Sequence, residues 1–145
     1  MANTIDLDGD ALKREFDSGG TVTPGMLVEQ SGTDIIAHNS AAENAERAFA
    51  LEQDELGNTI SDNYASGQRI KVGFFPSGAR VNALISTVDV TQGAFLESAG
   101  DGTLRTVAGD AATSQAQRAS VVAVAEETVS NAGGSGNVRI TVRAV

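Results

Sequence analysis

Alternation of apolar and polar side chains predicts two β-strands near the middle of the chain, joined by a sharp turn. Ile70, Val72 and Phe74 alternate with polar or small residues, which is the two-residue period of a strand with one buried face. The same period resumes at residues 81–85. Between the strands, residues 76–78 (Pro-Ser-Gly) favour a turn, because proline presets φ and glycine accepts a positive φ. The pattern therefore predicts a β-hairpin.

Short apolar runs separated by turn residues continue along the chain and indicate an all-β fold. Further strands are expected at residues 26–29, 35–38, 47–52, 88–90, 94–97, 103–107, 120–127 and 138–145. Ile60 and Tyr64 favour one short helical turn, because side chains four positions apart share a helix face. Aromatic residues make up only 4% of the chain, so the core must consist mainly of Val, Ile, Leu and Ala. We expect a small β-barrel or a pair of packed sheets in one domain, residues 21–145.

The first 20 residues are polar and are expected to form an extended N-terminal arm. Such a segment is either a frayed terminus or an arm that docks on a partner. Its apolar side chains, Ile5, Leu7, Leu12 and Phe16, are the candidate anchors for a partner contact. Deletion of residues 1–18 should then weaken attachment and leave the β-domain folded.

The two halves of the chain resemble each other, which predicts two similar β-units. Residues 22–32 align with residues 90–100, a shift of 68 positions. Residues 50–52 align with 124–126 at a shift of 74, and residues 69–72 with 139–142 at a shift of 70. The repeats are expected at about residues 21–75 and 88–145. The turn at residues 76–78 then becomes the joint of a duplicated scaffold.

The charge of the chain excludes two classes of partner. A net charge of −9 and a pI near 4.4 would repel nucleic acid and anionic membrane surfaces. No apolar run approaches the length of a membrane span, and Met1 is not followed by a signal-peptide pattern, so synthesis and use in a cytosol are expected. The absence of cysteine excludes disulfides and thiolate chemistry.

An acidic segment near the N-terminus has the spacing of a calcium loop. Asp6, Asp8 and Asp10 alternate, and Asp17 occupies the position of the twelfth ligand. However, Ala11 stands where such a loop needs glycine for a sharp turn. We interpret the segment as solvated acidic residues, and no metal site is predicted.

The sequence offers no set of catalytic residues. His38 is the one histidine, with no metal-ligand pattern beside it, and is expected at a strand end or on the surface rather than in an active site. The nucleophile elbow, the phosphate loop and the dinucleotide fingerprint are all absent. We therefore expect neither enzymatic activity nor a cofactor.

Several sequence segments resemble those of the head decoration proteins of tailed bacteriophages, also called capsid cement or stabilisation proteins. The similar stretches are residues 16–29, 48–52, 72–78, 93–105 and 138–145. The resemblance implies a β-rich domain that binds the outside of an icosahedral head, with the major capsid protein as its partner and a homotrimer as its assembly. It implies no catalytic residues.

The expected function is therefore that of a structural virion protein on the capsid surface, made in the host cytoplasm. Binding only the expanded lattice and bridging adjacent capsomers would stabilise the head by linkage. The alternative is a β-barrel module of a phage or cell surface that binds a carbohydrate or a receptor.

Overall fold

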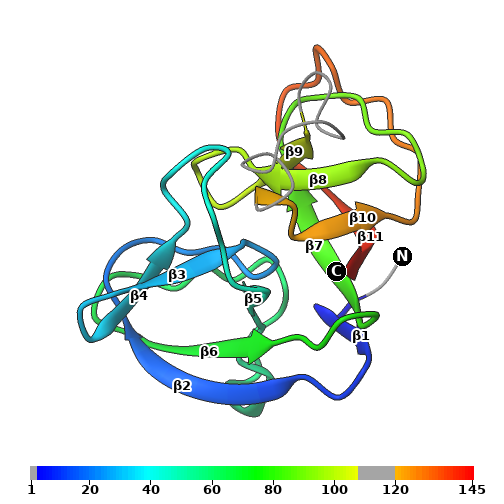
Figure 1. The fold of residues 1–145 in the computed structure, drawn as a ribbon. Helices are drawn as coiled ribbons and strands as arrows, with labels where there is room; N and C mark the ends of the chain where they lie inside the picture. Colours follow the sequence, from blue (N-terminus) through cyan, green and yellow to red (C-terminus); the bar gives the residue numbers. More distant parts are fainter. Residues whose placement is uncertain (1–2, 108–119) are drawn as a thin grey trace.

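The regular secondary structure of the described residues is almost entirely β-strand, which confirms the predicted all-β class. A computed structural model describes residues 3–107 and 120–145 (Figure 1). Between residues 3 and 107 the helical element is a 3₁₀ turn, η1 (Asp54–Leu56), and not the predicted turn around Ile60. Across the described residues, no helix is long and apolar enough to cross a lipid bilayer.

The first half of the chain forms a closed five-stranded barrel. Its strands are β2 (Leu12–Ser18), β3 (Val28–Ser31), β4 (Asp34–Ala37), β5 (Ala48–Ala50) and β6 (Arg69–Phe74), in the order β3-β4-β2-β6-β5. The β2–β4 pair is parallel and the other pairs are antiparallel. The barrel closes where Leu27 pairs with Phe49, and where Ala50 N donates to Met26 O at 2.9 Å. Closure leaves this sheet without a free edge.

The second half forms another sheet that closes in the same way. Its strands are β7 (Arg80–Ile85), β8 (Phe95–Ser98), β9 (Leu104–Thr106), β10 (Ala123–Ala125) and β11 (Val138–Ala144). Their order is β7-β11-β10-β8-β9, and a parallel pairing of Ile85 with Leu104 returns β9 to β7. A short strand near the N-terminus, β1 (Asp6–Asp8), pairs with the beginning of β7 at Arg80 and Val81.

The two barrels have the same topology, which confirms the prediction of two similar β-units. Replacing each strand of the first barrel by the strand five places later gives the strand order of the second. Individual bonds also recur. Gly25 N donates to Ala50 O at 2.8 Å, and Gly93 N donates to Ala125 O at 2.8 Å. Each barrel is therefore one copy of a duplicated unit.

One predicted alignment between the repeats is wrong by a single position. Ala50 pairs with Val72 on β6, and Ala125 pairs with Val142 on β11. Ala50 therefore corresponds to Ala125, a shift of 75 and not 74. The sequence matched Glu52 to the first of two adjacent glutamates, and short alanine- and valine-rich strands do not fix register by composition alone.

The predicted N-terminal arm is wrong for most of its length. Strand β2 lies between β4 and β6 inside the first barrel, and β1 belongs to the second sheet. Charged residues at 13–15 concealed this strand, because they leave it without a clean alternation. The repeats accordingly begin at β2 and at β7, earlier than residues 21 and 88. Deleting residues 1–18 would remove a barrel strand, so the domain is not expected to stay folded.

The predicted central hairpin is also wrong in its pairing, although both strands exist. Strand β6 lies in the first barrel and β7 in the second, and they do not pair with each other. The turn at residues 76–78 is therefore the joint between two barrels, as the repeat indicated.

Two apolar clusters form the core of the protein. One fills the first barrel with Val22, Val28, Ile35, Ala48, Ala50, Tyr64, Ile70 and Val72. The other combines the interior of the second barrel with first-barrel residues at the junction, including Leu27, Phe49 and Phe75. The rings of Phe49 and Phe75 meet edge to face with centroids 5.8 Å apart, a favoured aromatic geometry.

Candidate functional site

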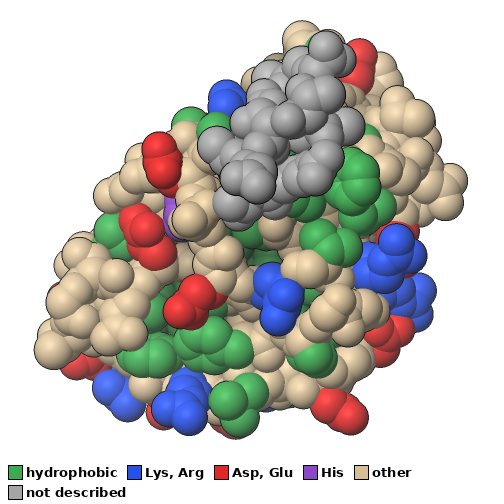
Figure 2. Space-filling model, viewed as in Figure 1, with side chains coloured by type: hydrophobic (Ala, Val, Ile, Leu, Met, Phe, Trp, Pro, Cys, Tyr) green, Lys and Arg blue, Asp and Glu red, His purple; other side chains and the backbone are tan. Residues whose placement is uncertain are grey.

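A groove lined by both apolar and polar side chains runs along one face of the molecule, from the end of the first barrel to the chain's C-terminal residue. Figure 2 shows apolar side chains gathered on the lower part of this face, over the first barrel. The groove has two sections that share Glu46 and Phe74. The section on the first barrel is lined by Leu12, Arg14, Phe16, Gln30, Glu46 and Phe74, and the other section by Ala45, Glu46, Arg47, Phe74, Phe75, Val121 and Val145.

The register of β2 against β6 creates the first section. Leu12 lies opposite Phe74, and Phe16 lies opposite Ile70, so these side chains share one face of the pair. Ile70 is buried in the barrel interior, whereas Leu12 lies beyond its end and is 57% exposed. The rings of Phe16 and Phe74 meet edge to face at 6.3 Å. An exposed apolar surface of this kind is typical of a contact site.

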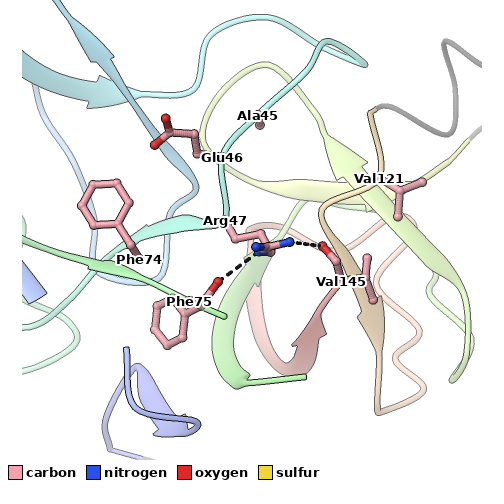
Figure 3. Close-up of a pocket in the computed structure, with 7 residues that line it drawn as sticks. All are labelled: Ala45, Glu46, Arg47, Phe74, Phe75, Val121 and Val145. Carbon is pink, nitrogen blue, oxygen red and sulfur yellow. Dashed lines mark hydrogen bonds between the residues drawn. The ribbon is translucent and has the colours of Figure 1, made fainter. Parts of the chain in front are cut away.

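Arg47 forms the boundary between the groove and the second barrel. Its Nε donates to the carbonyl oxygen of Phe75 at 3.0 Å, and its Nη1 donates to the carbonyl oxygen of Val145 at 2.9 Å (Figure 3). These two bonds tie the end of β11 to the first barrel. The neighbouring Glu46 is exposed, so the groove carries charges of both signs beside its apolar lining.

The structure divides the four candidate contact residues into two pairs. It brings Leu12 and Phe16 together at the groove. It does not bring Ile5 and Leu7 there, because both belong to the segment of β1 beside the second barrel. Ile5 is fully buried and is part of the core, whereas Leu7 is partly buried. Ile5 is therefore not available to a partner in this fold.

Sequence reasoning missed the other half of the groove. Phe74 was expected in the core because it continues the alternation of Ile70 and Val72. The available signal was the adjacent pair Phe74-Phe75, since neighbouring strand residues point to opposite faces. Phe75 takes the core position, and Phe74 lies half-buried at the end of the barrel.

The acidic segment near the N-terminus forms ion pairs in the structure. Asp8 Oδ2 lies 2.6 Å from Arg80 Nε, and this hydrogen bond lowers the pKa of the Asp8 carboxyl. Asp17, at the position where a calcium loop would have its twelfth ligand, has its Oδ1 3.1 Å from Arg69 Nη1. Within the part of the chain that the structure describes, no three His, Cys, Asp or Glu residues form a group that could hold a metal ion.

His38 occupies a strand end, as expected, but it is buried and not on the surface. It follows β4 and is 1% exposed. Its Nδ1 lies 2.7 Å from Ser98 Oγ and its Nε2 lies 3.2 Å from Asn44 O. Ser98 is itself fully buried, so this serine and histidine connect the two barrels away from any open surface.

Comparison with known proteins gives a likeness of fold. No protein-family model matches the chain, and no curated protein is similar to it in sequence. The fold is similar to the N base of head fiber gp8.5 of bacteriophage phi29, known from a crystal structure. The TM-score is 0.58 at 14% sequence identity, and the match covers 94% of this chain and 95% of that chain. The two proteins therefore share a fold along nearly their whole lengths.

Proposed function

We propose that this chain is a structural protein of a bacteriophage particle that attaches to the outside of the head. The observation that carries the proposal is the fold shared with a phage head fiber base over 94% of this chain. The proposal assigns the chain no catalytic role and no cofactor. Its partner is the major capsid protein, and its place is the virion surface after synthesis in the host cytoplasm.

The groove is the proposed contact with the capsid. Leu12, Phe16 and Phe74 offer apolar surface beside the charged side chains of Arg14 and Glu46. A core of apolar side chains with a polar rim is the usual composition of a protein interface. The remaining acidic surface keeps the decorated particle soluble through charge repulsion.

The proposed mechanism is stabilisation of the expanded head by linkage. A protein that binds only the expanded lattice, across adjacent capsomers, lowers the free energy of that lattice alone. Each contact can be weak, because many identical copies act on one shell. Assembly into a homotrimer would further increase the number of contacts that each bound oligomer makes with the capsid.

A binding module for carbohydrates or a receptor is the second candidate. The observation that favours it is the pair of half-buried rings, Phe16 and Phe74, beside the polar side chains of Gln30, Arg14 and Glu46. Aromatic faces next to hydrogen-bonding groups suit a ligand with both apolar and polar surfaces.

The test is cosedimentation of the purified chain with empty heads that lack it, both expanded and unexpanded. The wild-type chain should bind the expanded heads and raise their melting temperature. Leu12→Ser should weaken binding about tenfold or more, because it removes an apolar side chain from the contact. Leu56→Ser is the matched control, since Leu56 is 75% exposed on η1, outside the groove. Binding to a glycan panel and not to heads would favour the second candidate.

A further inference from the structure

Because the two barrels are copies of one unit, a surface of the first barrel can be compared with the equivalent surface of the second. On the first barrel, Leu27 and Phe49 pair across the closing seam and point away from the barrel interior, toward the second barrel. Both side chains are fully buried, and Leu27 N donates to Gly102 O of the second barrel at 2.8 Å. This surface is the contact by which the first barrel docks on the second.

The equivalent surface of the second barrel is formed by Phe95 and Val124. These two residues pair between β8 and β10, at the position equivalent to the Leu27–Phe49 pair of the first barrel. The next bonds correspond as well. His38 N donates to Leu27 O, and Val107 N donates to Phe95 O. The equivalence is therefore one of backbone position and side-chain direction.

Among the described residues, no barrel lies against the second copy of this docking surface, and yet its central side chain is a phenylalanine. Phe95 is 56% exposed, whereas its counterpart Leu27 is fully buried. Val124 is 8% exposed and lies beside it. A phenylalanine at a position that serves as a barrel contact in the other repeat indicates a surface that receives a partner.

The charges around Phe95 favour a second copy of this chain as that partner. Arg105 Nε lies 3.1 Å from Glu97 Oε1 on one side, and Arg143 Nη1 lies 3.4 Å from Glu126 Oε1 on the other. Each arginine is thus neutralised by a carboxylate. Two chains of net charge −9 repel each other, and they do so least where the local charges cancel.

The surface at the far end of the first barrel disfavours a head-to-tail arrangement, in which the Phe95 face of one copy would contact that surface of the next copy. In the second barrel, Leu84 and Arg139 receive the first barrel through bonds to Gly25 O and Pro24 O. Their equivalents in the first barrel are Asp17 and Arg69, an ion pair whose side chains are 58% and 59% exposed. Burying this charged pair against Phe95 would cost desolvation energy. Contact between like faces avoids that cost.

We propose that copies of this chain associate through the Phe95 face, in a closed ring whose rotation axis passes beside Phe95. Each copy then covers the exposed ring of the others, and the contact is symmetric. The contact is small, so association is expected between about 1 µM and 1 mM. This inference does not rest on the proposed binding to a phage head.

The first experiment measures molar mass against concentration by sedimentation equilibrium. The wild-type chain should associate, and Phe95→Ser should raise the dissociation constant about tenfold or more. Leu56→Ser removes a still more exposed leucine on the first barrel and should leave association unchanged. Thermal unfolding of each variant confirms that it is folded. A monomeric wild-type chain up to about 1 mM, as expected if the face receives a different protein, would overturn the proposal, and so would equal association of the Phe95→Ser variant.

The second experiment tests the symmetry of the contact. The chain has no cysteine, so Phe95→Cys introduces a single thiol. Near a rotation axis, two such thiols meet, and an added disulfide reagent (oxidised glutathione) takes up their two electrons as they form an intermolecular disulfide, whereas Leu56→Cys should form it much more slowly. Equal rates for the two variants would contradict the symmetric contact. Head binding is probed separately by Leu12→Ser, so either proposal can fail without the other.

Discussion

The phenol of Tyr64 donates a 2.6 Å hydrogen bond to the backbone carbonyl of Leu51, inside the first barrel. Tyr64 is 4% exposed and is part of the apolar cluster that fills this barrel. The bond anchors the long connection between β5 and β6 to the strand it leaves. Burial raises the pKa of Tyr64 to about 12, because the charged phenolate would lose its hydration.

This shift predicts a loss of stability at alkaline pH. The unfolded tyrosine titrates near 10, so between pH 10 and 12 the folded chain holds a proton that the unfolded chain has lost. The stabilisation is complete below pH 10 and is lost as pH rises through 12. Tyr64 is the single tyrosine and tryptophan is absent, so tyrosinate absorbance reports this residue alone. A titration midpoint near 10 in the folded chain would contradict the prediction.

Tyr64→Phe removes the hydrogen bond and keeps the ring. We expect it to lower the free energy of unfolding by about 1 kcal/mol at neutral pH. It should also flatten the fall in stability between pH 10 and 12, because the titrating group is gone. Denaturant unfolding of both chains at neutral and alkaline pH measures the two effects.

The packing at the junction between the barrels predicts that alanine is more destabilising at Gly102 than at Gly67. Gly102 has a φ of +84°, and an added Cβ would lie 3.0 Å from both Ala37 and Met26 of the first barrel. Gly67 has a φ of +85° with nothing within 4 Å of an added Cβ. Gly67→Ala should cost only the backbone strain, about 1–2 kcal/mol. Gly102→Ala should cost about 1–3 kcal/mol more, because it also overpacks the junction. Equal losses in denaturant unfolding would show that the barrels separate easily.

Local pattern was sufficient to find most strands and the duplication. Gly25 and Gly93, each with a positive φ in the structure, begin equivalent segments in the two halves and set the shift of 68. Pairing between strands was not accessible in the same way. The tight turn at residues 76–78 predicts that the strands on either side form one hairpin, yet closure of each barrel places them in different sheets.

The candidate site was found in part, for a related reason. Leu12 and Phe16 stand out as apolar residues in a polar segment, and they do share one face of the β2–β6 pair. Their neighbour Phe74 comes from β6, and only the register of β2 against β6 brings it to the same place. Ile5 has the same local character as Leu12 but is covered by the second barrel. Exposure is a property of the tertiary fold, which local pattern does not determine.

The hydrogen bonds of Asp89 predict that acid lowers the stability of the second barrel. Its Oδ1 accepts hydrogen bonds from the backbone N–H groups of Ala132 and Asn131, both at 2.8 Å. These bonds, the one from Ala132 first, lower the pKa of the Asp89 carboxyl in the folded chain. The stabilisation is therefore present above the unfolded pKa, near 4, and is lost as pH falls through the lower folded value.

Asp89→Asn should accordingly lower the melting temperature at pH 7 and have little effect in acid, where the wild-type carboxyl is protonated. Asp10→Asn removes the same charge from an exposed turn and is the control. If Asp89→Asn changed the melting temperature equally at pH 7 and in acid, the charge of the Asp89 carboxylate would be excluded as the cause of the change.

Arg139 and its counterpart in the other repeat provide the last prediction. Arg139 Nη2 donates to Pro24 O at 2.9 Å and to Ile60 O, and so links β11 to two loops of the first barrel. Burial lowers the pKa of this guanidinium, and its buried Nε has no hydrogen-bond partner among the described residues. The side chain of the equivalent Arg69 is 59% exposed and pairs with Asp17 at the surface.

Arg139→Met keeps much of the side-chain volume but leaves the two carbonyl oxygens without this donor. Hydrogen bonds from a charged donor stabilise more than neutral ones, so we expect the free energy of unfolding to fall by about 1–3 kcal/mol. Arg69→Met removes the same charge from the equivalent strand position and should change stability by no more than about 0.5 kcal/mol. Urea unfolding of the two variants makes the comparison. A more stable Arg139→Met variant would mean that the desolvation cost of the guanidinium exceeds what its hydrogen bonds to the first barrel contribute.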